Sequence, residues 1–486
     1  MASPVVNTAF KTRKSIRQIF NYTNLQQCRL QSSTTTHTFI DSEKGKEVSV
    51  LIPAKPESAP FSAPPLARLS TASILRTLVL SAFFTTPWLF KPGFAAFEKV
   101  ANSQSPWLNP DRNPLLRSAI YPLVYKQFCA GRNPAEIART SADVRKLGFS
   151  GIVLCYGKEV QVREHADESV GCGKEKPNSM DMEIDQWADG NMKTLDMIAA
   201  GDWLGIKFTG AGTKITKALM DGDEAPAKFM EAMDRICEYA ASKGCRIWID
   251  AEQQVLQATI DEWTFDLMRR YNRPGSPALV YNTIQAYLKS ARHKVQHQLE
   301  LSQREGWRPA IKLVRGAYIA NEMRARIHDT KEDTDASYNG IVEDLLRGNF
   351  QAQADLHQQQ HDAEEVDLLL AGHNIETIRK AARLASELAR QSRLKVRLEF
   401  GQLQGMADDI GCELLQAADE VKAEKSSPMA NTYIPKVYKC LTWGSIQECM
   451  QYLVRRLVEN RGAAERMKVG AAQFRRELWR RVGVRS

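Results

Sequence analysis

Three consecutive segments decide the fold: GIKFTG (205–210), PAKFMEAMDRICEYAASKG (226–244) and RIWIDAE (246–252). The first and third are short apolar runs that end in polar residues, as buried strands do. The second has the length and apolar spacing of an amphipathic helix. This order predicts a parallel βαβ unit.

The same alternation recurs along the chain, with helix-length segments such as IETIRKAARLASELARQSR (375–393) between the strand-like runs. The other six runs are GIVLCYG (151–157), ALVYNTIQAY (278–287), AIKLVRGA (310–317), VDLLLAGHN (366–374), KVRLEFGQL (395–403) and KVYKCLTWG (436–444). Eight strands alternating with helices predict an α/β fold, a (β/α)₈ TIM-type barrel with an N-terminal helical arm. A doubly wound open sheet is the alternative.

Outside the barrel, composition divides the chain into segments. Residues 1–40 carry five basic and no acidic residues and are rich in Ser and Thr, which is typical of a mitochondrial presequence; a disordered basic tail is the alternative. We expect a Pro-rich linker at 41–70, a helical arm at 71–147, the barrel at 148–465 and a basic C-terminal tail at 466–486.

The charge and cysteine content exclude two classes of protein. Residues 1–40 contribute +5 of the net charge of +9, and residues 465–486, with seven basic and two acidic residues, another +5. The remaining −1 leaves a nearly neutral body, unlike a nucleic-acid-binding protein. The nine cysteines include no CxxC pair, which favours a reducing compartment without a metal site or a disulfide framework.

Two segments suggest contact with a membrane surface. The run from Ile74 to Phe90 is the most apolar, but Arg76 and Pro87 interrupt it, so we expect a buried or membrane-surface helix. The tail interleaves aromatic and basic residues and is compatible with an anionic membrane surface or with a solvated terminal helix.

Polar residues gather at the ends of the strand-like runs, which form one rim in a barrel. They are Lys207, Thr209, Asp250, Glu252, Gln285, Lys312, Arg315, His373, Asn374, Glu399 and Gln402. Each alone is more often structural than catalytic, but their convergence on one rim predicts a site.

The helix YLVRRLVEN (452–460) adds a candidate anion receptor. Tyr452, Arg455, Arg456 and Glu459 are three or four residues apart and share one helix face. Two guanidinium groups beside an aromatic ring can bind a small carboxylate, although a solvated basic face is the simpler interpretation of the pair alone.

The motifs IKFTG, IDAE, IQAYLK, KLVRGAYIANE, EDTDASYN, GHN, EFGQLQGM and YLVRRLVEN occur in this order. Together they resemble proline dehydrogenases, over roughly residues 125–465, with the fungal mitochondrial type most similar. The resemblance implies a distorted (β/α)₈ barrel that binds FAD without a GxGxxG dinucleotide motif, and no such motif follows a strand here. It further implies oxidation of L-proline to pyrroline-5-carboxylate, with hydride passing from C5 to flavin N5. Electrons would pass to membrane quinone on the matrix side of the inner mitochondrial membrane, in the first step of proline catabolism.

Residue roles also follow from the resemblance. Arg455 and Arg456 would bind the proline carboxylate, with Tyr452, Cys440 and Leu313 around the substrate. Lys207 and Asp250 would form a charged pair near the reacting atoms. The residues implied for FAD are Gln285, Lys312, Val314, Arg315, Gly316, Ala317, Thr334, Asp335, His373, Asn374 and Glu459.

One departure from the family pattern bears on the substrate. Cys440 stands where most members carry a Tyr that covers the substrate ring. The space left by the smaller residue admits 4-hydroxyproline or another cyclic imino acid as an alternative substrate. A non-catalytic barrel that binds a metabolite is a third reading.

Overall fold

The computed structural model describes residues 63–103, 105–156, 177–319, 322–350, 366–424, 431–459 and 463–483. The expected presequence and most of the linker lie outside these ranges. The fold is therefore described for the part of the chain that begins at residue 63.

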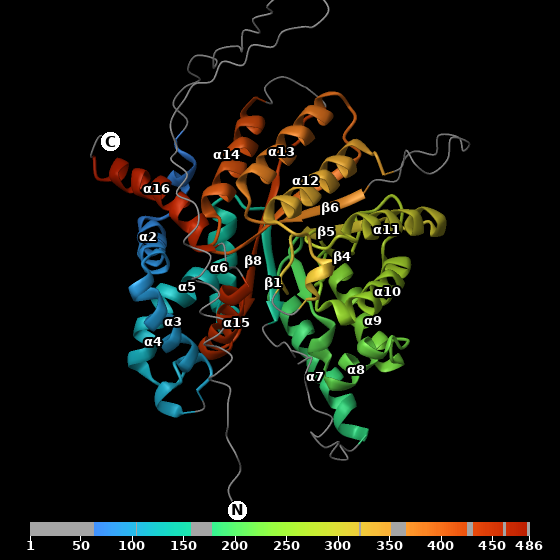
Figure 1. Cartoon of the computed structure of the whole chain (residues 1–486), viewed down its shortest axis with the longest axis horizontal. Coiled ribbons are helices and arrows are strands. Elements are labelled where there is room, and N and C mark those ends of the chain that lie inside the picture. Colours follow the sequence, from blue (N-terminus) through green and yellow to red (C-terminus); the bar gives the residue numbers. More distant parts are fainter. Residues whose placement is uncertain are drawn as a thin grey trace, which may run out of the picture. The chain divides into compact units, whose positions relative to one another are not determined.

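Eight parallel strands close into a barrel in sequence order (Figure 1). They are β1 (Gly151–Tyr156), β2 (Trp203–Ile206), β3 (Arg246–Ile249), β4 (Val280–Gln285), β5 (Ala310–Val314), β6 (Val366–Ala371), β7 (Val396–Leu403) and β8 (Lys436–Trp443). β8 pairs with β1, with Val153 opposite Cys440, and this pairing closes the sheet. The predicted (β/α)₈ barrel is confirmed, and the open sheet is excluded.

Helices surround the strands, whose residues are buried on both faces and need cover outside the barrel. In α9 (Ala227–Ser242), for example, Phe229, Met233 and Ile236 are fully buried in the main core. The other helices of the barrel region are α7 (Pro177–Asp196), α8 (Thr213–Asp221), α10 (Gln254–Tyr271), α11 (Ala291–Glu305), α12 (Lys331–Arg347), α13 (Ile375–Arg390) and α14 (Asp408–Glu424).

The N-terminal arm consists of α2 (Thr71–Thr85), α3 (Pro87–Ala101), α4 (Pro114–Ile120), α5 (Lys126–Phe128) and α6 (Pro134–Lys146). The apolar run at 74–90 is two helices, α2 and α3, because the chain bends by 100° at the break before Pro87. Proline suits the first turn of a new helix, where its missing N–H is not needed.

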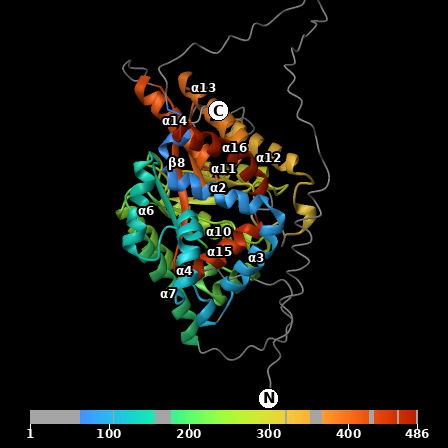
Figure 2. The same ribbon diagram turned by 90° about the vertical axis from the view of Figure 1, so that its left-hand side faces the viewer.

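The two last helices pack on this arm. α15 (Ile446–Glu459) packs against α3, and α16 (Ala463–Arg481) packs against α2. Figure 2 shows α2 and α16 next to each other, and Phe474 of α16 shares a small core with Ile74 of α2. α16 spans position 465/466, where we placed the start of the basic tail, so most of that segment is helical.

Glu399 does not belong to the polar rim. Its carboxylate binds the guanidinium of Arg246, with N–O distances of 2.6 and 3.3 Å. Arg246 is the first residue of β3 and stacks on Trp203 at 3.8 Å, so the pair closes the N-terminal end of the barrel. We predicted Glu399 at the C-terminal rim of the barrel, which is wrong. β7 is eight residues long and carries inward-facing side chains near both of its ends, so a polar residue on this strand can lie at either end of the barrel.

Candidate active site

A cavity of about 770 Å³ opens at the C-terminal ends of the strands. Its floor consists of barrel residues, and its walls come from helices distant in the sequence: α2 (Thr77, Ser81), α15 (Tyr452) and α16 (Phe474). Cavities that bind ligands usually measure 300–1,000 Å³. The cavity is therefore large enough for a cofactor-sized molecule.

A partly buried ion pair lies on the cavity floor. The ammonium of Lys312 on β5 binds the carboxylate of Asp250, which follows β3 directly. The side chain of Lys312 is only 7% exposed, and its nitrogen lies 3.8 Å from the centroid of Trp248. Opposite charges at this separation attract each other more strongly than they would in water.

The expected pairing of Lys207 with Asp250 is not the one observed. Lys207, just after β2, donates to the hydroxyl of Tyr318 at 2.7 Å, and Asp250 pairs with Lys312 instead. Tyr318 is almost completely buried and lies in the motif KLVRGAYIANE, but it was not among the predicted site residues. Both lysines nevertheless line the same cavity.

Gln285 at the end of β4 organises the neighbouring loop. Its amide nitrogen donates to the carbonyl of Glu252 at 3.4 Å, and its amide oxygen accepts from the backbone N–H of Ala317 at 3.2 Å. Gly316, the preceding residue, has φ of +143°, and a Cβ there would lie 2.2 Å from the ring of Tyr287. Only glycine fits this turn, which holds the loop after β5 against the cavity.

Arg315 is fixed from three sides. Its guanidinium binds Asp335 at 2.7 Å, donates to the hydroxyl of Thr377 at 2.8 Å and stacks over Tyr338 at 4.5 Å. Burial alone raises the pKa of Asp335, but Lys331 and Arg315 hold it below its ordinary value. The carboxylate stays ionised and keeps the guanidinium at the cavity wall.

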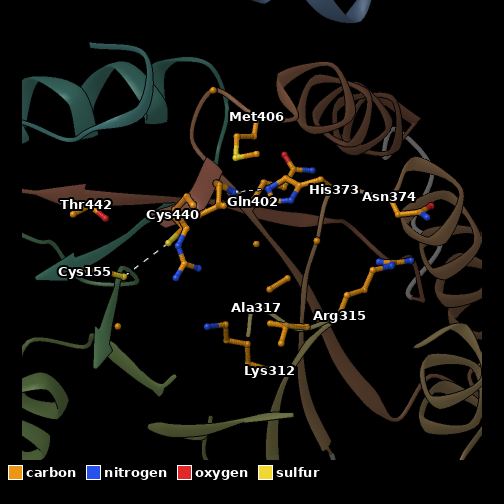
Figure 3. Close-up of a pocket in the computed structure, with 18 of the residues that line it drawn as sticks. Cys155, Lys312, Arg315, Ala317, His373, Asn374, Gln402, Met406, Cys440 and Thr442 are labelled. Atoms are coloured by element: carbon orange, nitrogen blue, oxygen red, sulfur yellow. Dashed lines mark hydrogen bonds between the residues drawn. The ribbon is translucent and has the colours of Figure 1, made fainter. Parts of the chain in front are cut away.

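The start of α13 forms the adjacent wall. The side chain of Asn374 caps this helix by accepting from the backbone N–H of Thr377 at 3.1 Å. His373 accepts from the backbone N–H of Leu403 on Nε2 at 3.0 Å. A capped helix N-terminus beside Arg315 is a favourable place for phosphate groups (Figure 3).

The predicted anion receptor faces the cavity from α15. Tyr452, Arg455 and Arg456 all line it, and the guanidinium of Arg456 lies 5.4 Å from the Tyr452 ring centroid. Burial raises the pKa of the Tyr452 phenol well above its ordinary value, although Arg456 opposes this shift. The phenol therefore stays neutral beside the two cations.

Two thiols meet between β1 and β8. The Sγ atoms of Cys155 and Cys440 are 3.9 Å apart, and both side chains line the cavity (Figure 3). Cys440 was expected near the substrate, whereas Cys155 was not expected at all. Only the closed barrel brings these two positions, 285 residues apart, together.

The sequence model of one family, proline dehydrogenase, matches residues 137–469. The chain belongs to the proline dehydrogenase family. It is 28% identical over 463 residues to a probable mitochondrial proline dehydrogenase of Schizosaccharomyces pombe, covering 85% of this chain and 89% of that protein. It is 26% identical to the hydroxyproline dehydrogenase of Mus musculus, and the match covers 85% of this chain and 92% of that protein.

The fold also matches a solved structure of proline utilization A from Bdellovibrio bacteriovorus that was inactivated by N-propargylglycine. The TM-score is 0.56 at 18% identity, over 82% of this chain and 40% of that chain. At this identity, the match supports the barrel fold alone.

Four of the residues assigned by resemblance to the proline dehydrogenase family are not placed in the cavity wall. Leu313 is fully buried and points from β5 to the face opposite Lys312, so it does not line the cavity. Thr334 donates to the carbonyl of Thr330 within α12, and Asp335 acts through Arg315. Glu459 ends α15, and its side chain lies outside the described part of the structure.

Proposed function

We propose that this protein is an FAD-dependent enzyme that oxidises L-proline to pyrroline-5-carboxylate, the first step of proline catabolism. The observation that carries the proposal is the convergence of Tyr452, Arg455 and Arg456 on the cavity above the Lys312–Asp250 pair. Two guanidinium groups suit a carboxylate, and the phenol ring of Tyr452 offers an apolar surface to a small ring.

The residues around the cavity fit FAD. The group needs cations or N–H donors for two phosphates and polar contacts for a flat ring system. Arg315 and the N-terminus of α13 supply the cation and the N–H donors for the phosphates. Gln285 and Lys312 supply polar groups for the ring system on the floor of the cavity. When bound, the flavin would supply hydride acceptance, which no side chain can provide.

The task left to the protein is to orient the substrate and set its protonation. Arg455 and Arg456 would hold the carboxylate, which fixes the ring relative to the floor. Lys207 and Arg456 place positive charge in the same cavity, and a cation disfavours a second cation nearby. The bound amine would therefore be neutral, the form that can give up a hydride from the adjacent carbon.

The second candidate substrate is 4-hydroxyproline, because Cys440 leaves space beside the substrate position. We expect the unaltered enzyme to prefer L-proline, since a thiol is a weak hydrogen-bond partner for the added hydroxyl. Cys440→Tyr should fill the space and lower kcat/KM for trans-4-hydroxy-L-proline about tenfold more than for L-proline.

Steady-state rates with both substrates check this expectation, and Cys440→Ser, which keeps the space, is the matched control. Equal losses for both substrates in Cys440→Tyr would remove Cys440 as a specificity residue. A preference of the unaltered enzyme for hydroxyproline would make the second candidate the better assignment.

The proposed electron acceptor is a membrane quinone, reached from the matrix side of the inner mitochondrial membrane. No single helix in the described ranges is long and apolar enough to cross a bilayer; α2 and α3 pass that test only as a pair bent by 100°. Along these two helices Val79 is 52% and Trp88 73% exposed, and Trp479 of α16 is 51% exposed. Because α2 and α16 also wall the cavity, peripheral contact through this face would bring a lipid-soluble acceptor close to the site.

Vesicle binding tests the contact. Exposed Arg475 and Arg476 on α16 supply positive charge, and each basic residue near an anionic membrane contributes about 1 kcal/mol. We expect the protein to sediment with anionic phospholipid vesicles, and Arg475→Gln/Arg476→Gln to weaken this binding roughly thirtyfold. Arg273→Gln, an exposed arginine in the loop before β4, should have no effect. Binding that is equal for all three proteins would place the contact elsewhere.

A further inference from the structure

The two cysteines in the cavity differ from the other cysteines of the described chain. Cys129, Cys237, Cys245, Cys412 and Cys449 are buried, whereas Cys155 and Cys440 are partly exposed. The two partly exposed thiols are also the pair whose Sγ atoms lie 3.9 Å apart. Reagents that enter the cavity therefore meet two thiols at once.

The separation of the two sulfur atoms fits a single bridging metal ion. Tetrahedral Zn²⁺ with Zn–S bonds of about 2.3 Å holds two thiolates about 3.8 Å apart. A disulfide requires an S–S bond of about 2.05 Å, so the two sulfur atoms would have to move closer by nearly 2 Å. Since Cys155 and Cys440 sit on paired strands of a closed barrel, the bridging ion needs less movement than the disulfide.

We infer that Cys155 and Cys440 form an inhibitory site for a thiophilic divalent ion such as Zn²⁺. Each thiol loses its proton when the Zn–S bond forms, so one ion is bound and two protons are released without oxidation or reduction. The bound ion would lie in the cavity that Tyr452 also lines, in the space proposed for the substrate. The inhibition by zinc rests on the proposed function, whereas the binding of zinc does not.

The surroundings indicate a reversible ligand rather than a resident metal. No group of three or more His, Cys, Asp or Glu side chains suited to a metal occurs in the described residues. Two positions on the ion would remain for water, unlike the four protein ligands of a structural zinc site. The contact with Cys440 and burial raise the pKa of the Cys155 thiol, so the ion has to displace a bound proton; Asp250 adds to this shift and Lys312 opposes it.

Zinc binding to the purified flavoprotein tests the site directly. Equilibrium dialysis with ZnCl₂ should show one ion bound per chain, displaced by EDTA, and L-proline oxidation should fall in parallel and recover with EDTA. Cys155→Ser, which keeps the size but removes a soft ligand, should weaken Zn²⁺ binding and inhibition at least about tenfold, since even an indirect ligand contact contributes that much.

Two controls separate this site from other effects of zinc. Cys245→Ser changes a buried thiol outside the cavity and should bind and respond like the unaltered protein. MgCl₂, a hard cation, should not inhibit. Equal zinc affinity in Cys155→Ser and the unaltered protein would overturn the inference, as would the absence of a bound ion. If zinc binds as expected but L-proline is not oxidised, the site stands and the proposed function fails.

Discussion

Arg455→Met is expected to raise the KM for L-proline roughly tenfold to a hundredfold while FAD remains bound. Arg455 lines the cavity from α15, and a charge-assisted hydrogen bond to a carboxylate contributes about 1.5–3 kcal/mol. The residues proposed for the phosphates of FAD lie just after β5 and at the start of α13, away from α15, so the cofactor should stay bound. Steady-state kinetics and the flavin absorbance of the purified variant give the two measurements.

The matched control for this substitution is Arg476→Met on α16. It removes the same charge from an exposed position outside the cavity and should leave the KM unchanged. An unaltered KM in Arg455→Met would show that this guanidinium does not hold the substrate carboxylate. A loss of flavin would instead assign Arg455 to the cofactor.

Glu399→Gln should lower the free energy of unfolding by about 3–5 kcal/mol, because it leaves the guanidinium of Arg246 without its charged partner. The side chain of Glu399 is 2% exposed and that of Arg246 is 13% exposed, so water cannot replace the lost interaction. Denaturant unfolding of both proteins measures the difference.

Glu413→Gln serves as the control for the buried pair. Glu413 binds Arg379 in a partly exposed pair, with side chains 27% and 40% exposed, and such pairs contribute about 0–1 kcal/mol. Equal destabilisation by the two substitutions would contradict a structural role for the pair at the N-terminal end of the barrel. Unchanged kinetics in folded Glu399→Gln would agree with the position of Glu399 outside the cavity wall.

The barrel could be predicted because each strand is a short apolar run with a polar or glycine ending. All eight runs contain a strand, and the helical segments at 226–244 and 375–393 are α9 and α13. The strand ends were less predictable. In the run 205–210 only Gly205 and Ile206 belong to β2, because the chain turns into a short 3₁₀ helix at Phe208.

Side-chain partners could not be predicted, because they depend on how the strands are staggered around the barrel. Lys207 and Asp250 follow neighbouring strands, yet Asp250 pairs with Lys312 two strands further along. The thiol pair of Cys155 and Cys440 likewise requires that β8 return to β1. The packing of α2 and α16 over the cavity is a contact between the two ends of the described chain, which no local pattern encodes.

The most direct test is anaerobic mixing of the purified protein with L-proline while the flavin absorption band is recorded. The proposed function predicts that the protein is yellow, that the band bleaches and that pyrroline-5-carboxylate appears in equal amount to the reduced flavin. A protein with bound flavin that L-proline does not bleach would contradict the proposed substrate, and a protein that binds no flavin would contradict the proposed chemistry.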